Sequence, residues 1–427
     1  MKILLSLYAC EPNRGSEPGV GWAWALGMSK RLNTYCLTRA NNKEIIEKEL
    51  QNLGYEKLDS EENGVDKYYN KNDGTKLRFI FIDLPKWILK LKQKHILPTS
   101  VYYIMWQFKA RNYFDSLKIN VDIIHHITFN SFVVPGVWWN RKEKVVLGPL
   151  GGTSICANHF LRVYPLSPRI KEFLRGLTRK SLKTNIFFNK SNKNADIVLL
   201  TDKKMVEKLK SNNTKKYSQL IETAIPEALT SPYYSAKVKR ENQFVWAGTM
   251  DGHKALEITL RAYAKAFGNN IENAPIIKIY GIGPNTNKMI KLAKKLKIYE
   301  MMEFNGKTSQ INLWEESRKS IALIFSSVRD TSGNVALEAM ANGTPVICFD
   351  HQGIGTIATE DTSIKIQPTS WDTSIHDFSE AMIKLTSNPE LVDILGENAR
   401  KHVLENYTWD KKFDIIESIY ISLTTKN

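Results

Sequence analysis

Short apolar runs alternate with helical stretches along the whole chain, and this alternation starts afresh near its middle. Continuous apolar runs of this kind are typical of parallel strands that are buried on both faces. They lie at residues 3–7, 79–82, 122–125, 144–148 and 196–200, and again at 243–248, 276–281, 321–325 and 345–349. A chain of 427 residues is also long enough for two domains. The sequence therefore predicts an α/β fold of two doubly wound units, joined near residues 232–240.

Basic charge is concentrated in the first half of the chain. Residues 1–240 carry 40 Lys and Arg against 21 Asp and Glu, whereas residues 241–427 carry 20 against 23. An excess of this sign favours phosphate-bearing partners, which include nucleic acid, an anionic membrane and nucleotide-linked substrates. No recognised nucleic-acid-binding motif accompanies it, so nucleic acid is not an expected partner.

Two stretches hold much of the positive charge. Residues 86–111 contain six basic residues and no acid, interleaved with aromatic and aliphatic side chains. In residues 162–183, Ser167-Pro168 suits a helix start, and one apolar stripe forms opposite basic positions. The stripe is Ile170, Phe173, Leu174 and Leu177, and the basic positions are Arg175, Arg179, Lys180 and Lys183. Both stretches are open to two interpretations, a solvated amphipathic helix or a surface that docks on an anionic membrane.

Cysteine spacing and hydropathy exclude several classes of protein. The cysteines at 10, 36, 156 and 348 form no C-x-x-C pair, so neither a zinc site nor a disulfide framework is expected. The apolar start of the chain is interrupted at Glu11-Pro12, which favours a buried strand over a signal peptide. No apolar run is long enough to span a bilayer. We expect a cytoplasmic protein whose membrane contact, if any, is peripheral on the inner face of the cell membrane.

Ligands bind at the carboxyl ends of strands in such sheets, so the loops that follow the strands are informative. After the first strand, Gly15, Gly19 and Gly21 lead into a helix whose free N–H groups can face an anion. The spacing is not G-x-G-x-x-G, which disfavours a dinucleotide site. The pair His125 and His126 ends another strand, and from the residues alone it is equally well structural or functional.

The second half contains a group of residues that points more specifically to a ligand. Lys254 ends the loop Gly248-Thr-Met-Asp-Gly-His-Lys, where a cation at a helix start could meet a diphosphate. Gly281 lies in a second glycine turn after a strand. Asp330 and Glu338 are two carboxylates eight positions apart, with Gly333 between them. They could accept hydrogen bonds from sugar hydroxyls at opposite ends of one nucleotide-sugar. Helix capping by Asp330 with a surface Glu338 is the alternative, although it leaves the neighbouring glycine turns unexplained.

Several motifs together resemble the retaining glycosyltransferases of family 4, which have the GT-B fold. They are Glu-Pro-x-x-Gly-Ser-Glu-Pro-Gly-Val-Gly-Trp at 11–22, Asp-Ile-Ile-His-His-Ile-Thr at 122–128, Gly-Pro-Leu-Gly-Gly at 148–152, Tyr-Gly-Ile-Gly-Pro at 280–284 and Leu-Glu-Ala-Met-Ala-Asn-Gly-Thr-Pro-Val at 337–346. The likeness covers nearly the whole chain. It implies two Rossmann-like domains that face each other across a cleft: residues 1–238 bind the acceptor, residues 239–405 bind the nucleotide-sugar, and residues 406–427 cross back to the first domain.

The resemblance also implies roles for individual residues. Glu338 is expected to bind the ribose hydroxyls and Asp330 the donor sugar, although the family usually has Glu at that position. Lys254 matches the family's diphosphate lysine, but Thr249 stands where an arginine is usual, which removes a charge-assisted contact. The further donor-site residues are Gly333, Asn334, Val335, Gly281, Gly15 and Gly19. His126 or His125 is expected at the donor sugar, and Glu17 on the acceptor side.

These roles predict glycosyl transfer from a nucleotide-sugar to a glycan or lipid-linked acceptor, in bacterial cell-surface polysaccharide synthesis. Neither a metal nor another cofactor is expected, because Lys254 and helix N-termini can stabilise the departing diphosphate. Thr249 and Asp330 leave open a non-catalytic nucleotide-sugar or glycan binder with the same fold. A nucleotide-sugar epimerase or a phosphorylase of related fold is a further alternative. The sequence does not decide the donor base, the donor sugar, the acceptor or the linkage.

Overall fold

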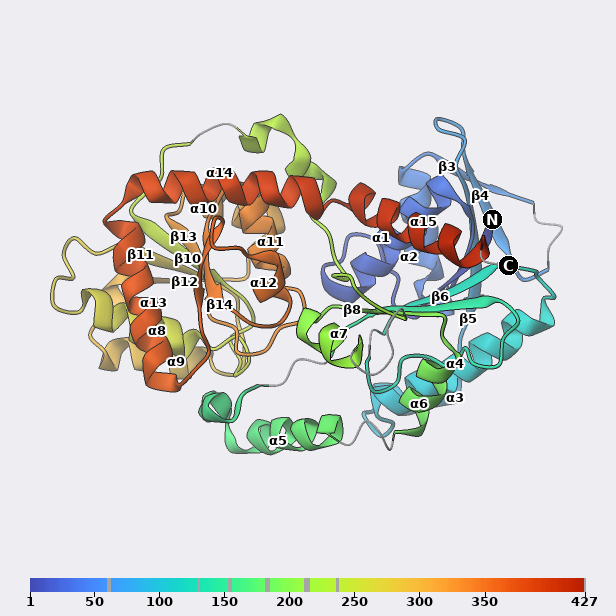
Figure 1. Cartoon of the computed structure of the whole chain (residues 1–427), viewed down its shortest axis with the longest axis horizontal. Helices are drawn as coiled ribbons and strands as arrows, with labels where there is room; N and C mark the ends of the chain where they lie inside the picture. Colours follow the sequence, from blue (N-terminus) through green and yellow to red (C-terminus); the bar gives the residue numbers. More distant parts are fainter. Residues whose placement is uncertain are drawn as a thin grey trace. The chain divides into compact units, whose positions relative to one another are not determined.

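The computed structural model describes residues 1–59, 63–129, 131–152, 156–180, 185–210, 216–235 and 238–425. The chain divides into two compact units (Figure 1). Unit 1 comprises residues 1–153, 181–222 and 413–427, and unit 2 comprises residues 154–180 and 223–412. Each unit is built around its own sheet, as predicted from the pattern of apolar runs, which begins again near the middle of the chain.

Among the described residues, unit 1 has a nine-stranded sheet in the order β3-β4-β5-β2-β1-β6-β7-β8-β9. The strands are β1 (Lys2–Leu7), β2 (Asn33–Arg39), β3 (Tyr55–Leu58), β4 (Asp66–Asn70), β5 (Lys76–Ile82), β6 (Ile123–Thr128), β7 (Lys144–Leu150), β8 (Ile197–Leu200) and β9 (Tyr217–Gln219). The helices are α1 (Ser16–Arg31), α2 (Lys43–Asn52), α3 (Lys86–Gln93), α4 (Thr99–Ser116), α6 (Ile186–Asn194) and α7 (Lys203–Lys210), followed at the end of the chain by α15 (Trp409–Thr424).

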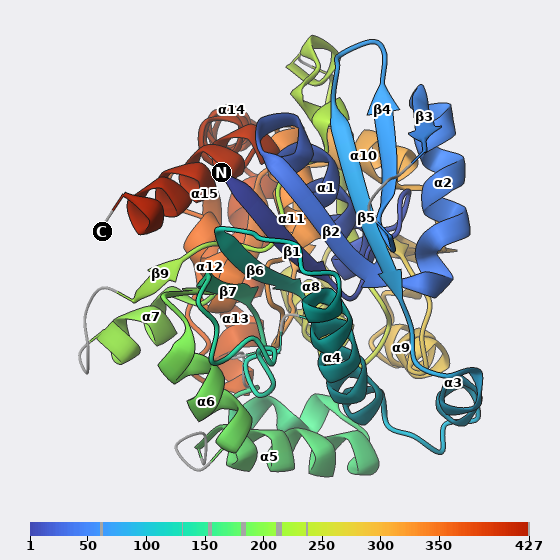
Figure 2. The ribbon, with the colours of Figure 1, turned by 90° about the vertical axis from the view of Figure 1, so that its right-hand side faces the viewer.

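Most strand pairs of unit 1 are parallel, and the two exceptions involve β4, which pairs antiparallel with β3 and β5. The five apolar runs predicted in this half correspond to β1, β5, β6, β7 and β8. Helices cover both faces of the sheet (Figure 2). Consecutive residues of β6 show this arrangement, because His125 contacts Trp24 of α1 and Tyr420 of α15, whereas His126 contacts Tyr103 of α4.

The last helix, α15, belongs to unit 1 from Phe413 onward. Phe413 packs against Trp24 with ring centroids 5.5 Å apart. It also fills the space beside Gly27, where an added Cβ would lie only 2.0 Å from the Phe413 ring. Arg31 at the end of α1 pairs with Asp414 at 2.7 Å and Glu417 at 2.9 Å.

In unit 2, the described residues form a six-stranded, all-parallel sheet in the order β12-β11-β10-β13-β14-β15. The strands are β10 (Gln243–Ala247), β11 (Ile276–Tyr280), β12 (Met302–Gly306), β13 (Ala322–Phe325), β14 (Val346–Phe349) and β15 (Ser363–Ile366). The helices are α5 (Leu166–Lys180), α8 (Leu256–Phe267), α9 (Thr286–Lys295), α10 (Gln310–Arg318), α11 (Asn334–Ala341), α12 (Gln352–Ile357), α13 (Trp371–Thr386) and α14 (Pro389–Asn406).

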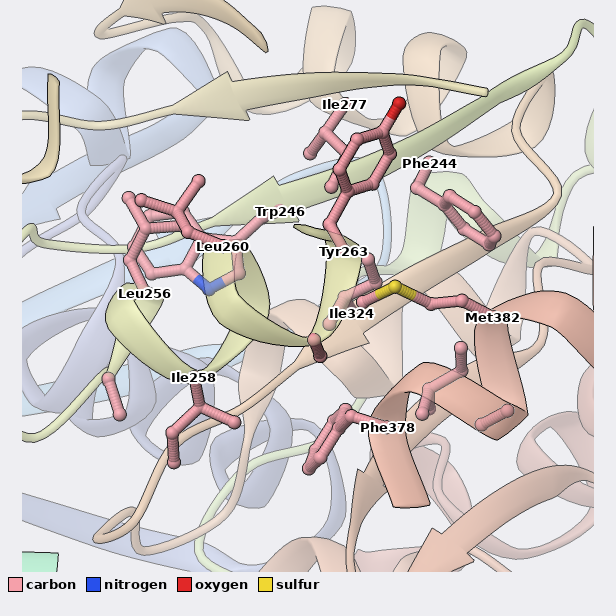
Figure 3. Packing of buried hydrophobic residues seen from close by; sticks show 14 of the residues in the cluster. Phe244, Trp246, Leu256, Ile258, Leu260, Tyr263, Ile277, Ile324, Phe378 and Met382 are labelled. Atoms are coloured by element: carbon pink, nitrogen blue, oxygen red, sulfur yellow. The ribbon is translucent and has the colours of Figure 1, made fainter. Parts of the chain in front are cut away.

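The core of unit 2 lies between this sheet and helices α8 and α13, as Figure 3 shows. Phe244 and Trp246 of β10 pack with Leu260 of α8 and Phe378 of α13, and all four side chains are almost completely buried. Burial of one such side chain stabilises the fold by about 1.5–3 kcal/mol. This core holds the carboxyl ends of β10, β11 and β13 in fixed positions.

Residues 156–180 belong to unit 2, although they follow β7 of unit 1 in the sequence and the sequence analysis assigned them to the first domain. Phe160 and Tyr164 are buried in the core of unit 2. Phe160 packs against Phe349 with ring centroids 5.2 Å apart. A Cβ on Gly252 would lie 2.4 Å from Tyr164, so the glycine allows this segment to approach the loop after β10.

All four cysteines are buried and unbridged. Burial raises the pKa of the Cys36, Cys156 and Cys348 thiols to about 12, so these groups stay protonated and unreactive. No helix within the described part of the chain is long and apolar enough to cross a membrane.

Candidate functional site

Two loops of unit 2 meet at the carboxyl ends of β10 and β11. The N–H of Gly248 donates to the carbonyl of Tyr280 at 3.0 Å, and the N–H of Met250 donates to that of Ile282 at 3.2 Å. Gly281 has φ +129°, and a Cβ there would lie 1.9 Å from the Gly248 carbonyl oxygen. Only glycine fits this close approach, so the predicted glycine turn fixes the loop that carries Lys254.

The loop after β10 is held internally by Asp251. Its carboxylate accepts from the backbone N–H of His253 at 3.1 Å, and the His253 ring lies 2.7 Å from the same oxygen. Burial alone would raise the pKa of Asp251, but these interactions with His253 keep it below its ordinary value. The carbonyl of His253 in turn accepts from Val328 at 2.9 Å, which joins this loop to the one after β13.

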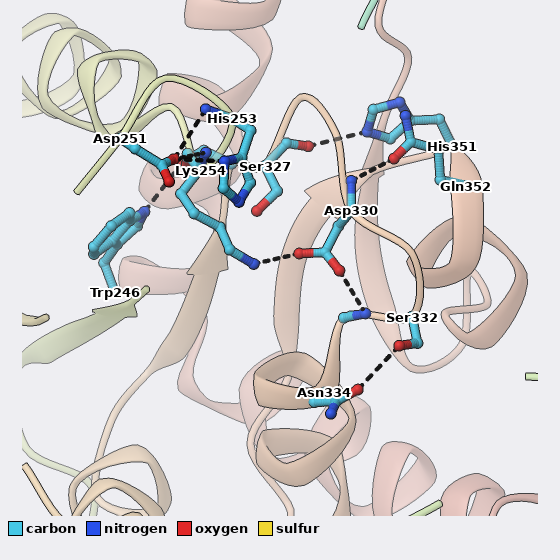
Figure 4. Close-up of polar contacts among 12 residues, drawn as sticks. Trp246, Asp251, His253, Lys254, Ser327, Asp330, Ser332, Asn334, His351 and Gln352 are labelled. Carbon is cyan, nitrogen blue, oxygen red and sulfur yellow. Dashed lines mark hydrogen bonds and ion pairs between the residues drawn. The ribbon is translucent and has the colours of Figure 1, made fainter. Parts of the chain in front are cut away.

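Lys254 and Asp330 form an ion pair between these two loops (Figure 4). The side chains are 20% and 17% exposed, so the pair is poorly screened by water. The Lys254 ammonium also lies over the ring of Phe325, 5.3 Å from its centroid. The structure therefore brings together the predicted diphosphate lysine and the first predicted carboxylate.

Asp330 has two further contacts that set its position. Its Oδ1 accepts from the N–H of Gly333 at 3.0 Å, and its own N–H donates to Oε1 of Gln352 at 2.5 Å (Figure 4). Burial opposes ionisation of Asp330, but the charge and hydrogen bond of Lys254 keep its pKa below the ordinary value. Asp330 is therefore ionised at neutral pH, and its Oδ1 holds the turn that precedes α11; the N-cap of α11 is Gly333, and no side chain caps the helix there.

The start of α11 faces the same region. Gly333 adopts a left-handed conformation with φ +68°, and Asn334 and Val335 supply the first N–H groups of the helix. Ser332 donates to Oδ1 of Asn334 at 3.0 Å (Figure 4). Free N–H groups and the positive end of the helix dipole make such a start suited to an anion. Lys254, through Asp330, is fastened to this helix start.

Glu338 lies one turn further along α11, and its carboxylate is directed toward α10. Oε1 accepts from Nε2 of Gln310 at 2.9 Å, and Oε2 accepts from Nε1 of Trp314 at 2.8 Å. Burial raises the pKa of Glu338 above its ordinary value, and the two hydrogen bonds only partly oppose that rise. A carboxyl group whose charged form is disfavoured by burial is typical of a binding site.

Thr249 is exposed on the loop after β10, at the position where the family resemblance predicts an arginine. Its neutral hydroxyl cannot make the bidentate contact that a guanidinium makes with a diphosphate. The predicted sources of positive charge that the structure places together here are Lys254 and the start of α11.

In unit 1, the glycine loop after β1 is tightly folded before α1. A Cβ on Gly19 would lie 1.9 Å from the Arg14 carbonyl oxygen, and one on Gly21 would lie 2.0 Å from that of Ala9. Gly15 is exposed and has open space around it. Glu17 lies in the first turn of α1, where the helix dipole stabilises its negative charge.

His125 and His126 are fully buried within unit 1. His125 is 2.6 Å from both the Tyr420 hydroxyl and the Gly148 carbonyl oxygen. His126 is 2.7 Å from the Tyr103 hydroxyl and 3.0 Å from that of Ser6. Burial lowers the pKa of both rings to about 3, so both are neutral. In this structure neither ring is open to a sugar, and the predicted donor contact would require Tyr103 or Tyr420 to move.

The structure thus gathers one group of the predicted residues in unit 2 and separate ones in unit 1. The unit 2 group consists of Lys254, Asp330, Gly333, Asn334, Val335 and Glu338, with Gly281 and Thr249 on the adjoining loops. Sequence reasoning missed Gln310 and Trp314, which donate to the Glu338 carboxylate, and Gln352, whose side-chain oxygen accepts from the backbone N–H of Asp330. Short motifs gave no signal for them, because they lie on other helices.

Among the described residues, no cluster of three or more His, Cys, Asp and Glu side chains is placed to hold a metal ion. The group in unit 2 instead offers one ammonium, helix N–H donors and two carboxylates. Such a set suits a ligand that carries both phosphate and hydroxyl groups.

The two Rossmann-like units place the chain in the class of proteins with the GT-B fold. A sucrose-phosphate synthase from Thermosynechococcus elongatus superposes over 100% of both chains, with a TM-score of 0.62 and 16% identity. The glycosyltransferase WaaG, which is involved in lipopolysaccharide biosynthesis, superposes over 99% of both chains with a TM-score of 0.57 and 15% identity. At this level of identity the likeness establishes the fold.

Sequence comparison finds relatives for the second half of the chain. Residues 233–402 match the family model of glycosyl transferases group 1. A D-inositol 3-phosphate glycosyltransferase of Streptomyces bingchenggensis is 27% identical over 184 residues, which are 41% of this chain and 39% of that protein. The chain therefore spans about two fifths of the length of the relatives it matches. The matched part contains Lys254, Asp330 and Glu338.

Proposed function

We propose that the protein is a retaining glycosyltransferase that moves a sugar from a nucleotide-sugar to a glycan or lipid-linked acceptor. The single observation that carries the proposal is the placement of Lys254, the start of α11 and Glu338 along one edge of the unit 2 sheet. The match of residues 233–402 to glycosyl transferases group 1 supports it. A role in bacterial cell-surface polysaccharide synthesis is part of the proposal, and the fold of WaaG supports that role.

In this proposal unit 2 holds the donor. Glu338 accepts hydrogen bonds from the ribose hydroxyls, in place of those from Gln310 and Trp314 or beside them. Lys254 and the N–H groups of Asn334 and Val335 meet the diphosphate. Asp330 orients Lys254 and lies at the donor-sugar end.

The reaction needs stabilisation of the negative charge that develops on the departing diphosphate. Lys254 and the start of α11 supply it through fixed charges and dipoles, so the proposed reaction uses neither a metal nor a protein nucleophile. The acceptor hydroxyl attacks on the face from which the diphosphate leaves, and a diphosphate oxygen takes its proton. The acceptor is held by unit 1, with Glu17 beside it, and is reached in the cytoplasm at the inner face of an anionic membrane.

The proposal is tested first with a panel of UDP-, GDP- and ADP-sugars, scored by calorimetric binding and by release of the nucleoside diphosphate. The Lys254→Gln variant should bind the selected donor about 10–100-fold more weakly, because a charge-assisted hydrogen bond contributes about 1.5–3 kcal/mol. Glu338→Ala should show a loss of similar size. Lys307→Gln is the matched control, since Lys307 is an exposed lysine outside the site. Unchanged binding and turnover in both site variants would refute the assignment.

A second candidate is a non-catalytic nucleotide-sugar binder with the same fold. Exposed Thr249 in the place of an arginine favours it, because the site has one diphosphate cation fewer than the family pattern. Saturable donor binding that depends on Glu338, without transfer or hydrolysis over any acceptor tested, would establish this candidate.

A further inference from the structure

A cavity of about 340 Å³ lies in unit 1 between α6 and the loop before β7. Asn140 comes four residues before the start of β7, and Asn194 three residues before that of β8, so the cavity is at the amino edge of the sheet. Ligands of such sheets bind at the opposite, carboxyl edge, which the seven residues of β7 place about 20 Å away. The described residues that line the cavity are Trp139, Asn140, Asn189, Lys190, Lys193 and Asn194.

Trp139 gives the cavity an aromatic wall that two other rings hold in place. Phe108 of α4 packs edge-on against it, with ring centroids 5.9 Å apart and an interplanar angle of 74°. Phe187 of α6 lies with its centroid 6.3 Å from that of Trp139. The indole is half-exposed, and its N–H donates to no group within the described part of the chain. Such an indole suits a ligand that has both an apolar face and hydroxyl groups.

Asn140 joins the loop to α6 through its backbone. It adopts a left-handed conformation with φ +55°, and its N–H donates to Oδ1 of Asn194 at 3.3 Å. Nδ2 of Asn194 donates in turn to the carbonyl oxygen of Lys190 at 2.7 Å. The exposed carboxamide of Asn140 itself has no hydrogen-bond partner among the described residues. A carboxamide offers a donor and an acceptor side by side, which matches two neighbouring hydroxyls of a sugar.

Two ammonium groups give the cavity a positive charge. Lys190 lies over the Trp139 ring, 5.8 Å from its centroid, and Lys193 is exposed three residues further along α6. Neither lysine forms an ion pair within the described residues, and no acid is among the described lining residues. The cavity therefore favours a ligand with a negative charge. Both lysines lie outside the two basic stretches found in the sequence; in the second stretch the side chains of residues 177–180, and Lys183, are outside the described residues.

The combination of these groups selects the class of ligand. An apolar partner is disfavoured, because Trp139 is the one apolar side chain of the described lining. A nucleic-acid strand is disfavoured, because two lysines cannot follow its phosphates over several nucleotides. A sugar with an acidic group matches all three features, namely the indole, the carboxamides and the ammonium groups.

We propose that this cavity binds an acidic saccharide unit. The sugar ring packs a C–H face against Trp139, its hydroxyls bond to the Asn140 carboxamide, and its carboxylate or phosphate meets Lys190 and Lys193. Because Lys190 lies over the same indole, the acidic group of a sugar on that ring is within its reach. The inference rests on the proposed function for its biological role, which is to hold a distant unit of a long acidic acceptor. The binding itself requires neither donor nor transfer.

The test is calorimetric titration of the full chain at 0.15 M salt with tetragalacturonic acid, with glucose 6-phosphate and with neutral cellotetraose. The wild type should bind an acidic sugar, and cellotetraose about 3–10-fold more weakly, because two exposed ion pairs are missing. Trp139→Ala should weaken the binding of the acidic sugar at least about tenfold, because a buried aromatic contact dominates sites of this kind.

Two further variants keep the test independent of the packing of Trp139. Asn140→Gly removes the carboxamide while glycine accepts the positive φ, and it should weaken binding about 2–10-fold through the lost hydrogen bonds. The double variant Lys190→Gln, Lys193→Gln should bind the acidic sugar no better than cellotetraose. Its matched control is Lys203→Gln, Lys204→Gln, which removes the same charge from exposed lysines of α7 and should bind like the wild type. These three variants should keep the wild-type thermal midpoint, because they change exposed side chains.

Any of four results would overturn the inference: no binding of either acidic sugar by the wild type, equal affinity for cellotetraose or for inorganic phosphate, wild-type affinity in the variants at positions 139, 190 and 193, or an equal loss in the α7 control. Tighter binding of an oligothymidylate that Trp139→Ala abolishes would show that a nucleic acid occupies the cavity instead. Donor binding is measured on the same preparations. Saccharide binding without donor binding would refute the proposed function alone, and donor binding without saccharide binding would refute the saccharide site alone.

Discussion

Replacing Gly281 by alanine should push apart the two loops that form the first wall of the unit 2 site. Its Cβ would lie 1.9 Å from the Gly248 carbonyl oxygen, whereas ordinary contacts begin at 3.4 Å. The loops must therefore separate by roughly 1.5 Å, or the backbone must leave its present conformation. The φ of +129° adds strain, because side-chain-bearing residues rarely adopt it.

The expected cost follows from these two contributions. Backbone strain of this kind costs about 1–3 kcal/mol, and overpacking costs about 1–3 kcal/mol, which together centre on about 4 kcal/mol. Gly306→Ala is the matched control, because Gly306 also has a positive φ, +67°, but its Cβ would meet nothing within 4 Å. Strain alone should cost about 1–2 kcal/mol there. For a unit of this size, the midpoints should fall by about 10 °C and about 4 °C respectively.

Differential scanning calorimetry measures both midpoints, and calorimetric titration with the donor found in the panel measures the site. Gly281→Ala should also weaken donor binding, because the displaced loop carries Lys254, whereas Gly306→Ala should bind normally. A Gly281→Ala midpoint no lower than that of Gly306→Ala would refute the argument from the close approach of the two loops.

Two further predictions concern the ion pair and the last helix. Lys254 holds the folded-state pKa of Asp330 below its ordinary value. Asp330→Asn should therefore cost about 2 kcal/mol at pH 7, and in thermal melts the difference from the wild type should vanish as the pH falls below about 4 and through that lowered pKa. Gly27→Ala should displace the Phe413 ring and destabilise unit 1 by about 1–3 kcal/mol, and adding Phe413→Leu should restore part of that loss, as measured by calorimetry.

Most of the strands that sequence patterning predicted are largely buried, although it missed β2, which lies between β5 and β1 and is buried from Thr34 to Thr38. β10 and β13 are examples of the predicted, largely buried strands, and their apolar runs are uninterrupted. The strands that it missed include all four edges of the two sheets, β3, β9, β12 and β15. Edge strands face solvent on one side and have mixed sequences such as Met-Glu-Phe-Asn-Gly in β12. The periodic signal is weakest there, because burial no longer demands apolar residues at consecutive positions.

The residues of the candidate site that lie in loops directly after strands were predictable from the sequence. Lys254, Asp330 and Gly333 lie in loops whose positions are set by neighbouring strands, so the parallel topology alone brings them near one another. The environment of the histidines was not predictable in this way. His125 and His126 face opposite sides of β6, and their partners Tyr420 and Tyr103 come from distant helices. Which side chain fills the space over a strand depends on long-range packing, for which short motifs carry no signal.

The contacts of Asp330 depend on the short length of its side chain. Its short side chain lets one carboxylate accept the Gly333 N–H of its own turn while it pairs with Lys254. A side chain longer by one methylene would carry the carboxylate beyond that N–H. Asp330 therefore fixes the ammonium beside the start of α11, so that the two sources of positive charge are in place before a ligand arrives. Electrostatic stabilisation is most effective when the charges need no reorganisation. In the donor site that we propose, this arrangement compensates in part for the guanidinium that Thr249 cannot supply.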